Sequence, residues 1–228
     1  MARGYDLTDE KETKEYLRDV EIEYKFQCLD QKEPDGCHRL AEFIENVRKN
    51  VADAAPIYKE NCNERKHPKS CYKYGQCLLT GKGVPGNKAD LISALQYYEK
   101  SCDLGLGGGC FNAAQLRMTD KVKSQQNTDK LVALLDRACE LKDGEACYRL
   151  SAFYLVGTLV EKNLKKSFNL AKAGCEAGSM FACNNLSLMY RHGNGTQKDE
   201  TLSQAAKKRA KELSEQLRKK QPTVALNQ

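Results

Sequence analysis

The sequence predicts an all-α protein, an α-solenoid superhelix of five helical hairpins linked by disulfide bonds. Two observations lead to this class. Ten of the eleven cysteines fall into five close pairs, and the first cysteines of successive pairs lie 34 to 40 residues apart. A period in this range is typical of helical repeat arrays. Between the pairs, large apolar residues recur three and four positions apart, as they do on one face of a helix.

The paired cysteines are predicted to join the end of one hairpin to the beginning of the next. The pairs are Cys28 with Cys37, Cys62 with Cys71, Cys102 with Cys110, Cys139 with Cys147, and Cys175 with Cys183. Two helices joined by a short turn bring residues eight or nine apart within reach of a disulfide bond. Buried thiols and zinc ligands are the alternatives, but zinc sites favour C-x-x-C spacings, which this chain lacks. Disulfide bonds would imply an oxidising compartment.

The first helix of each hairpin follows from an alignment on the second cysteine of each pair. Position +3 holds Leu40, Tyr74, Ala113, Leu150 and Leu186, and position +6 holds Phe43, Cys77, Leu116, Phe153 and Met189. Position +4 is small throughout: Ala41, Gly75, Ala114, Ser151 and Ser187. A small residue beside large ones lets a neighbouring helix approach closely. Gly81, Gly157 and Gly193 at position +10 are predicted to end their helices in the left-handed conformation.

A second amphipathic stretch then leads to the next cysteine pair, as in Ala94–Cys102, Ala133–Cys139 and Phe168–Cys175. We therefore expect an N-terminal helix and first turn in residues 1–36 and a basic, frayed tail in 218–228. The five repeats between them are predicted at about 37–68, 69–105, 107–144, 145–178 and 180–217. The third repeat carries a polar, irregular loop from Thr119 to Thr128.

Composition excludes several classes of function. The net charge is +6, Trp is absent, and aromatic residues make up 7% of the chain. They do not interleave with Arg and Lys as in an RNA-binding sheet, so nucleic-acid binding is not supported. No apolar run approaches the 18 residues of a membrane-spanning helix. The N-terminus turns acidic at once, which indicates neither a secretory signal nor a transit peptide.

The repeat carries a second signature in its loops. Leu78-Leu79-Thr80-Gly81-Lys82-Gly83-Val84 and Met189-Tyr190-Arg191-His192-Gly193-Asn194-Gly195 share the pattern of a large residue followed by Gly-x-Gly. With these loops the chain resembles Sel1-like repeats, short helical hairpins related to tetratricopeptide repeats. The turn Glu33-Pro34-Asp35-Gly36-Cys37 and the five cysteine pairs make residues 8–217 similar to the mitochondrial Sel1-repeat assembly factors of cytochrome c oxidase.

This resemblance implies a non-enzymatic scaffold for complex IV biogenesis in the mitochondrial intermembrane space. Its partners would be complex IV subunits or other assembly factors. Import would use the disulfide relay, which oxidises close cysteine pairs and needs no cleaved presequence. A secreted, cysteine-rich Sel1-type binding protein is an alternative, although such a protein requires an export signal.

Thiol–disulfide exchange in the same compartment is another alternative, and Cys77 is the unpaired cysteine. Exchange thiols need a lowered pKa, usually from a C-x-x-C at a helix N-terminus. Cys77 instead occupies position +6, which is apolar in the other repeats. Free cysteine behaves there as a small hydrophobic residue. We therefore expect Cys77 to be a reduced and poorly reactive core residue.

Haem binding is the remaining alternative, since iron takes His or Met as an axial ligand. The chain has three histidines, His38, His67 and His192, which are expected at the surface or in turns. Were haem to bind, His67 would be the first candidate ligand. The basic stretch from Lys207 to Lys220 is predicted to be a solvated helix that caps the last repeat. Its alternative role is peripheral contact with an anionic membrane.

Overall fold

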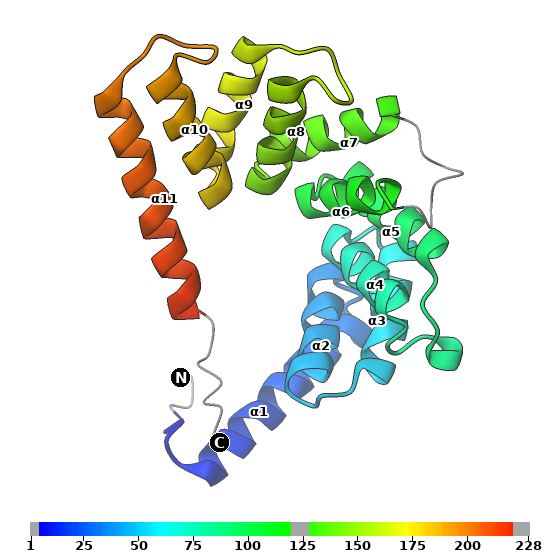
Figure 1. Ribbon diagram of the computed structural model, residues 1–228. Coiled ribbons are helices and arrows are strands. Elements are labelled where there is room, and N and C mark those ends of the chain that lie inside the picture. Colours follow the sequence, from blue (N-terminus) through cyan, green and yellow to red (C-terminus); the bar gives the residue numbers. More distant parts are fainter. Residues whose placement is uncertain (1–4, 120–127, 221–228) are drawn as a thin grey trace, which may run out of the picture. The chain divides into compact units, whose positions relative to one another are not determined.

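Helices make up every regular element in the described part of the chain (Figure 1). The computed structural model describes residues 5–119 and 128–220, and no strand occurs within these ranges. This confirms the predicted all-α class. The chain divides into two units, Met1–Gly105 and Leu106–Gln228. Most of the predicted Thr119–Thr128 loop and of the predicted frayed tail lies outside the described residues.

The first unit begins with α1 (Glu10–Lys25), whose N-cap Asp9 accepts a hydrogen bond from the backbone N–H of Glu12. The helix packs on α2 but has no fully buried residue. It continues into a π-helical turn, η1 (Phe26–Asp30), which the sequence pattern did not predict. Cys28 in this turn is only 4% exposed, whereas Phe26 and Leu29 are 49% and 57% exposed. The turn therefore directs one cysteine inward and leaves its apolar neighbours in solvent.

Two hairpins complete the first unit (Figure 1). α2 (Pro34–Asn46) packs on α3 (Val51–Asn63), and α4 (Pro68–Thr80) packs on α5 (Leu91–Asp103). α3 also packs on α4, so the two hairpins are stacked. A proline begins both α2 and α4, at the position where the missing N–H has no helical partner. A short 3-10 turn, η2 (Pro85–Asn87), lies between α4 and α5.

The second unit holds three hairpins. These are α6 (Gly107–Arg117) with α7 (Thr128–Glu140), α8 (Gly144–Val156) with α9 (Leu164–Glu176), and α10 (Met180–His192) with α11 (Glu200–Lys220). α7 packs on α8 and α9 packs on α10. The first hairpin of the chain begins at Pro34 rather than at residue 37, and the last helix continues to Lys220. Among described residues, no helix is both long and apolar enough to cross a bilayer.

The small residues at position +4 lie where the two helices of a hairpin meet. The hydroxyl group of Ser151 donates to the backbone carbonyl of Ser167, and the Ser167 hydroxyl donates back to Ser151, both at 2.8 Å. The Ser203 hydroxyl likewise donates to the carbonyl of Ser187 at 2.9 Å. Such bonds require closely approaching backbones. They confirm the predicted close contact between the helices of the last two hairpins.

The glycines at position +10 end their helices as expected. Gly81, Gly157 and Gly193 have φ values of +75°, +83° and +74°. This left-handed conformation costs glycine little because glycine has no Cβ atom. At Gly81, a Cβ atom would also lie 2.8 Å from the backbone nitrogen of Ala89. The loop therefore requires glycine at this position both for its conformation and for space.

Candidate functional site

Disulfide bonds join the end of one helical element to the beginning of the next, the first of them linking the π-helical turn η1 to α2. Four of the bonds join Cys28 to Cys37, Cys62 to Cys71, Cys139 to Cys147, and Cys175 to Cys183. In these bonds the Cα atoms are 4.3 to 4.7 Å apart. Cys102 and Cys110 are also disulfide-bonded, so ten of the eleven cysteines are oxidised.

The bonded cysteines are shielded from solvent. Cys71 and Cys147, which lie in the first turns of α4 and α8, have no exposed surface. The most exposed of the ten, Cys139 and Cys175, reach only 9% and 8%. The disulfide bonds therefore join helix ends at positions that are poorly accessible to a reacting thiol.

Cys77 is the free cysteine, and it lies buried in α4 with 5% of its surface exposed. Burial raises the pKa of its thiol to about 11, and the nearby Glu45 carboxylate contributes to the rise. The reactive thiolate is therefore scarce at neutral pH. The environment of Cys77 is that of a core residue and is the opposite of an activated thiol.

A buried polar cluster connects the first two hairpins. Its centre is the hydroxyl oxygen of Ser70, a residue with no exposed surface. Nδ1 of His38 lies 3.0 Å from this oxygen and Nδ1 of His67 lies 3.1 Å from it. The side-chain amide of Asn61 donates to the same oxygen at 2.8 Å and to the backbone carbonyl of Pro34 at 2.8 Å. We refer to His38, Asn61, His67 and Ser70 as the histidine cluster.

Hydrogen-bond donors fix the tautomer of His67. The backbone N–H of Ser70 donates to Nδ1 of His67 at 3.2 Å, so Nδ1 carries no proton in the neutral ring. The ring proton then sits on Nε2, which donates to Oδ1 of Asp35 at 3.1 Å. This hydrogen bond lowers the pKa of Asp35. Both ring nitrogens of His67 are therefore occupied.

The structure corrects the expectation that His38 lies at the surface or in a turn, because it lies within α2 and is buried. Only 6% of His38 and 7% of His67 are exposed, and their ring centroids are 4.7 Å apart. His67 does lie in a turn, as the N-cap residue of α4. His192 is exposed, as expected. The sequence pattern missed the burial because His38 contacts Ser70, and His67 contacts Asp35, across two hairpins, which helix periodicity does not show.

The position of His67 bears on the two chemical alternatives. Haem ligation by His67 would require it to give up its contact with either Asp35 or Ser70. The order Ser70–His67–Asp35 superficially resembles a hydrolytic triad, but the Ser70 hydroxyl is fully buried and held by three side chains. A nucleophile must reach its substrate. The histidine cluster is therefore suited to holding two hairpins in register.

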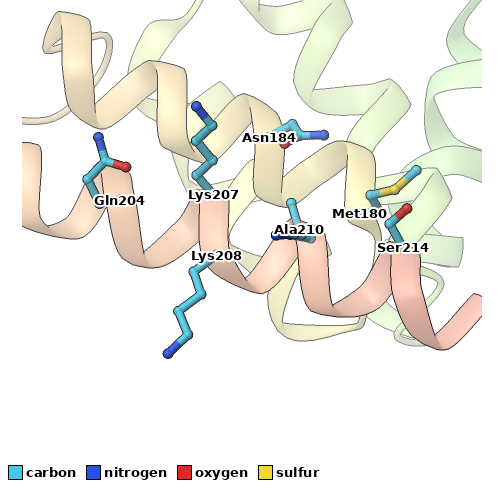
Figure 2. Close-up of a pocket in the computed structure, with 8 residues that line it drawn as sticks. Met180, Asn184, Gln204, Lys207, Lys208, Ala210 and Ser214 are labelled. Atoms are coloured by element: carbon cyan, nitrogen blue, oxygen red, sulfur yellow. The ribbon is translucent and has the colours of Figure 1, made fainter.

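An open groove lies between α10 and α11 of the last hairpin (Figure 2). Its volume is about 510 Å³. The lining residues are Met180 and Asn184 from α10, and Gln204, Lys207, Lys208, Ala210, Lys211 and Ser214 from α11. Ala210 is 3% exposed, and the three lysines are exposed. We call this feature the basic groove.

Sequence reasoning found the basic stretch of α11 but not the basic groove. The groove depends on how α11 (21 residues) packs on α10 (13 residues), which the sequence pattern of either helix alone does not show. Lys207 and Lys211 are four positions apart on α11, so they lie on the same side of the helix. The opposite side of α11 covers the last hairpin, where Ala206, Ala210 and Leu213 are buried.

Comparisons with known proteins agree with the repeat architecture. The Sel1 repeat family matches residues 68–106, 144–179 and 181–207. A Sel1 repeat protein from Oxalobacter formigenes has the same fold, with a TM-score of 0.71 and 19% identity over 90% of this chain and 85% of that one. The Escherichia coli antigen c5321 has a TM-score of 0.70 and 18% identity, covering 92% of this chain and 49% of that one.

More similar relatives extend along nearly the whole chain. Cytochrome c oxidase assembly factor 7 of Xenopus tropicalis is 36% identical over 93% of this chain and 94% of its own length. The human protein of the same name is 34% identical, with 96% of each chain covered. The Drosophila melanogaster homologue is 31% identical, with 99% and 97% covered. The chain therefore belongs to the Sel1-repeat family of cytochrome c oxidase assembly factor 7.

Proposed function

We propose that this protein is a non-enzymatic scaffold that assists the assembly of cytochrome c oxidase in the mitochondrial intermembrane space. The observation that carries this proposal is the 31–36% identity, over nearly the full length, to relatives named for that role. Its partners would be complex IV subunits or other assembly factors. Binding through surfaces, rather than chemistry at a centre, is the proposed mode of action.

The state of the cysteines supports a scaffold rather than an exchange enzyme. The ten bonded cysteines are at most 9% exposed, and the pKa of the one free thiol is raised. An exchange enzyme needs an accessible thiol with a lowered pKa. Disulfide bonds across the hairpin junctions would instead keep the repeats rigid, and a rigid binding surface loses less conformational entropy on association.

The cysteines also support the proposed compartment. Structural disulfide bonds form and persist in oxidising compartments. The intermembrane space provides such conditions, and the disulfide relay oxidises closely spaced cysteine pairs during import. Cys62 and Cys71 are nine residues apart, and Cys139 and Cys147 are eight apart. Location in this compartment would therefore reconcile a mitochondrial role with the oxidised cysteines.

Complementation tests the proposal directly. Cells lacking their own copy of the protein should contain less assembled complex IV on native gels, and expression of this chain should restore it. The Cys77→Ala variant should restore it equally well if the protein acts without thiol chemistry. Failure of a folded Cys77→Ala variant would contradict the non-enzymatic role. Protease protection in intact mitochondria and mitoplasts tests the compartment: the protein should be degraded only after the outer membrane is ruptured.

A further inference from the structure

The basic groove combines an apolar floor with uncompensated positive charge. Half-buried Met180 supplies apolar surface, to which the methylene stems of the lysines add, and the small Ala210 lies beneath them with 3% of its surface exposed. None of the eight lining residues is acidic. In Figure 2, Lys207 extends from α11 toward α10 and Lys208 extends away from α10.

The acidic residues of the last hairpin do not neutralise the positive charge of the basic groove. Helix α10 contains no Asp or Glu. Glu200 lies 3.8 Å from Arg191, and Glu212 lies 3.7 Å from Arg209, so both carboxylates face arginines rather than the groove. Glu215 lines a separate depression with Arg218 and Lys219. A ligand that enters the basic groove therefore meets a positive electrostatic potential and a small apolar surface.

The dimensions of the groove match a helix. The lining residues of α11 run from Gln204 to Ser214, which spans roughly 15 Å at the rise of an α-helix. On α10, Phe181 and Leu188 are 48% and 49% exposed but do not line the groove, and the Phe181 ring lies 5.5 Å from that of Tyr148 on α8. The apolar contacts of a helix in the groove would therefore come from Met180 and from the methylene stems of the lysines.

We propose that the basic groove binds an acidic amphipathic helix of a partner protein. The apolar side of that helix would lie on Met180 and the methylene stems of the lysines, and its carboxylates would pair with the lysine ammonium groups. The inference rests on the proposed scaffold role and adds the chemistry of the partner. Charge complementarity commits it to an acidic occupant, and the three-turn length commits it to a helix.

An anionic membrane is the less suitable occupant. A helix that lies on a membrane inserts its apolar face into the lipid. The apolar face of α11 is already used, because Ala206, Ala210 and Leu213 are 7%, 3% and 8% exposed in the core of the last hairpin. Only lysines remain for the lipid headgroups, and these follow a concave surface rather than a flat one.

A binding assay with the full chain tests the proposal. The probe is a fluorescent synthetic helix of about 14 residues with Leu on one face and Glu beside it; the control probe has Lys in place of Glu. The acidic probe should bind and the basic probe should not. Lys207→Glu combined with Lys211→Glu should weaken binding at least about tenfold. The matched control, Lys165→Glu with Lys172→Glu on α9, makes the same charge change outside the groove and should change binding less than about twofold.

A second variant separates the groove from charge alone. Asn184→Trp fills the groove and leaves every lysine in place, so it should abolish binding of the acidic helix. Equal binding by this variant and by the wild type would overturn the proposal. So would equal weakening by the two lysine pairs, since the probe would then sense only net charge. Preferential binding to cardiolipin-containing vesicles, without binding of the acidic helix, would assign the groove to lipid instead.

Complementation distinguishes failure of the groove from failure of the proposed function. If wild-type protein restores complex IV and Lys207→Glu with Lys211→Glu does so equally, the scaffold role stands and the basic groove is not its partner site. If wild-type protein restores nothing while the acidic helix still binds, the groove stands and the assembly role falls. The expected result is restoration by the wild type and by the α9 control pair, with little restoration by the groove variant.

Discussion

Nδ1 of His38 lies 3.0 Å from the hydroxyl oxygen of Ser70, although the two residues belong to different hairpins. His38 is in α2 and Ser70 is in the first turn of α4. His67 and Asn61 meet the same oxygen, so a single hydroxyl group holds the register of two repeats. Each side chain of the cluster needs the others as hydrogen-bond partners, because a buried polar group without a hydrogen bond lowers the free energy of unfolding.

Removing the central hydroxyl should destabilise the protein. Ser70→Ala removes the hydrogen-bond partner of Nδ1 of His38 and one of the two acceptors of the Asn61 amide, which keeps the Pro34 carbonyl. A buried polar group left without its hydrogen bond costs about 1–3 kcal/mol. We expect the urea midpoint to fall while the m-value stays unchanged. Ser214→Ala, at a partly exposed site on α11, should change stability by no more than about 0.5 kcal/mol. Equal midpoints for the two variants would contradict this role for Ser70.

The burial of His38 predicts a loss of stability in mild acid. Burial, and then the nearby His67 and the Lys69 and Lys73 charges, lower its pKa from 6.5 to about 4. Below pH 6.5 the unfolded chain therefore takes up a proton that the folded chain does not. The free energy of unfolding should fall between pH 6.5 and pH 4, with a slope that approaches about 1.4 kcal/mol per pH unit. Above pH 6.5 this contribution is fully present.

A variant without the titrating ring isolates this effect. Denaturation of His38→Gln across the same range should show a flatter pH dependence than the wild type. The carboxyl pKa values of Asp6, Glu21, Asp35 and Asp90 are lowered. Their contributions are present above the ordinary carboxyl pKa and begin to be lost only as the pH falls below about 5, so the interval from pH 6.5 to about pH 5 isolates the effect of His38. An unchanged slope in His38→Gln would mean that another group controls the transition.

How far the sequence could predict this structure depends on the range of each interaction. The spacing of the cysteines and the small residues at position +4 predicted the hairpins, because both recur once in every repeat of 34 to 40 residues. Gly81, Gly157 and Gly193 marked helix ends for the same local reason. The histidine cluster could not be predicted, because His38 bonds to Ser70 of the next repeat. No other pair of repeats has a histidine and a serine at these two positions. The π-helical turn at Phe26–Asp30 likewise has no counterpart in the repeat pattern.

Gly75 provides a test of the close packing between α4 and α5. A Cβ atom at this position would lie 2.9 Å from the ring of Tyr98, which is fully buried. Alanine improves helix propensity by about 1 kcal/mol, but overpacking a core costs typically about 1–3 kcal/mol. We expect Gly75→Ala to lower the melting temperature despite its better propensity. A higher melting temperature would show that the Tyr98 ring moves aside easily.

Each disulfide bond should stabilise its own junction. Cys175 and Cys183 are separated by eight residues, and closing so short a loop stabilises a chain by about 2–3 kcal/mol on the entropy model. Replacing both with alanine should lower the urea midpoint by a corresponding amount. In wild-type protein, reduction under denaturing conditions followed by alkylation should release this pair together with the other eight bonded cysteines. A double variant as stable as the wild type would show that helix packing alone holds this junction.

The accessibility of Cys77 provides the most direct test of the oxidised scaffold. Because burial raises the pKa of its thiol to about 11, little thiolate forms even at mildly alkaline pH. Iodoacetamide should therefore leave the native, non-reduced protein unlabelled. In denaturant without reductant, mass spectrometry should find one alkylated cysteine per chain, at Cys77. Labelling of the native protein at any bonded cysteine would instead reveal an open disulfide and favour thiol exchange, with Cys139 and Cys175 the first to react because they are the most exposed of the ten.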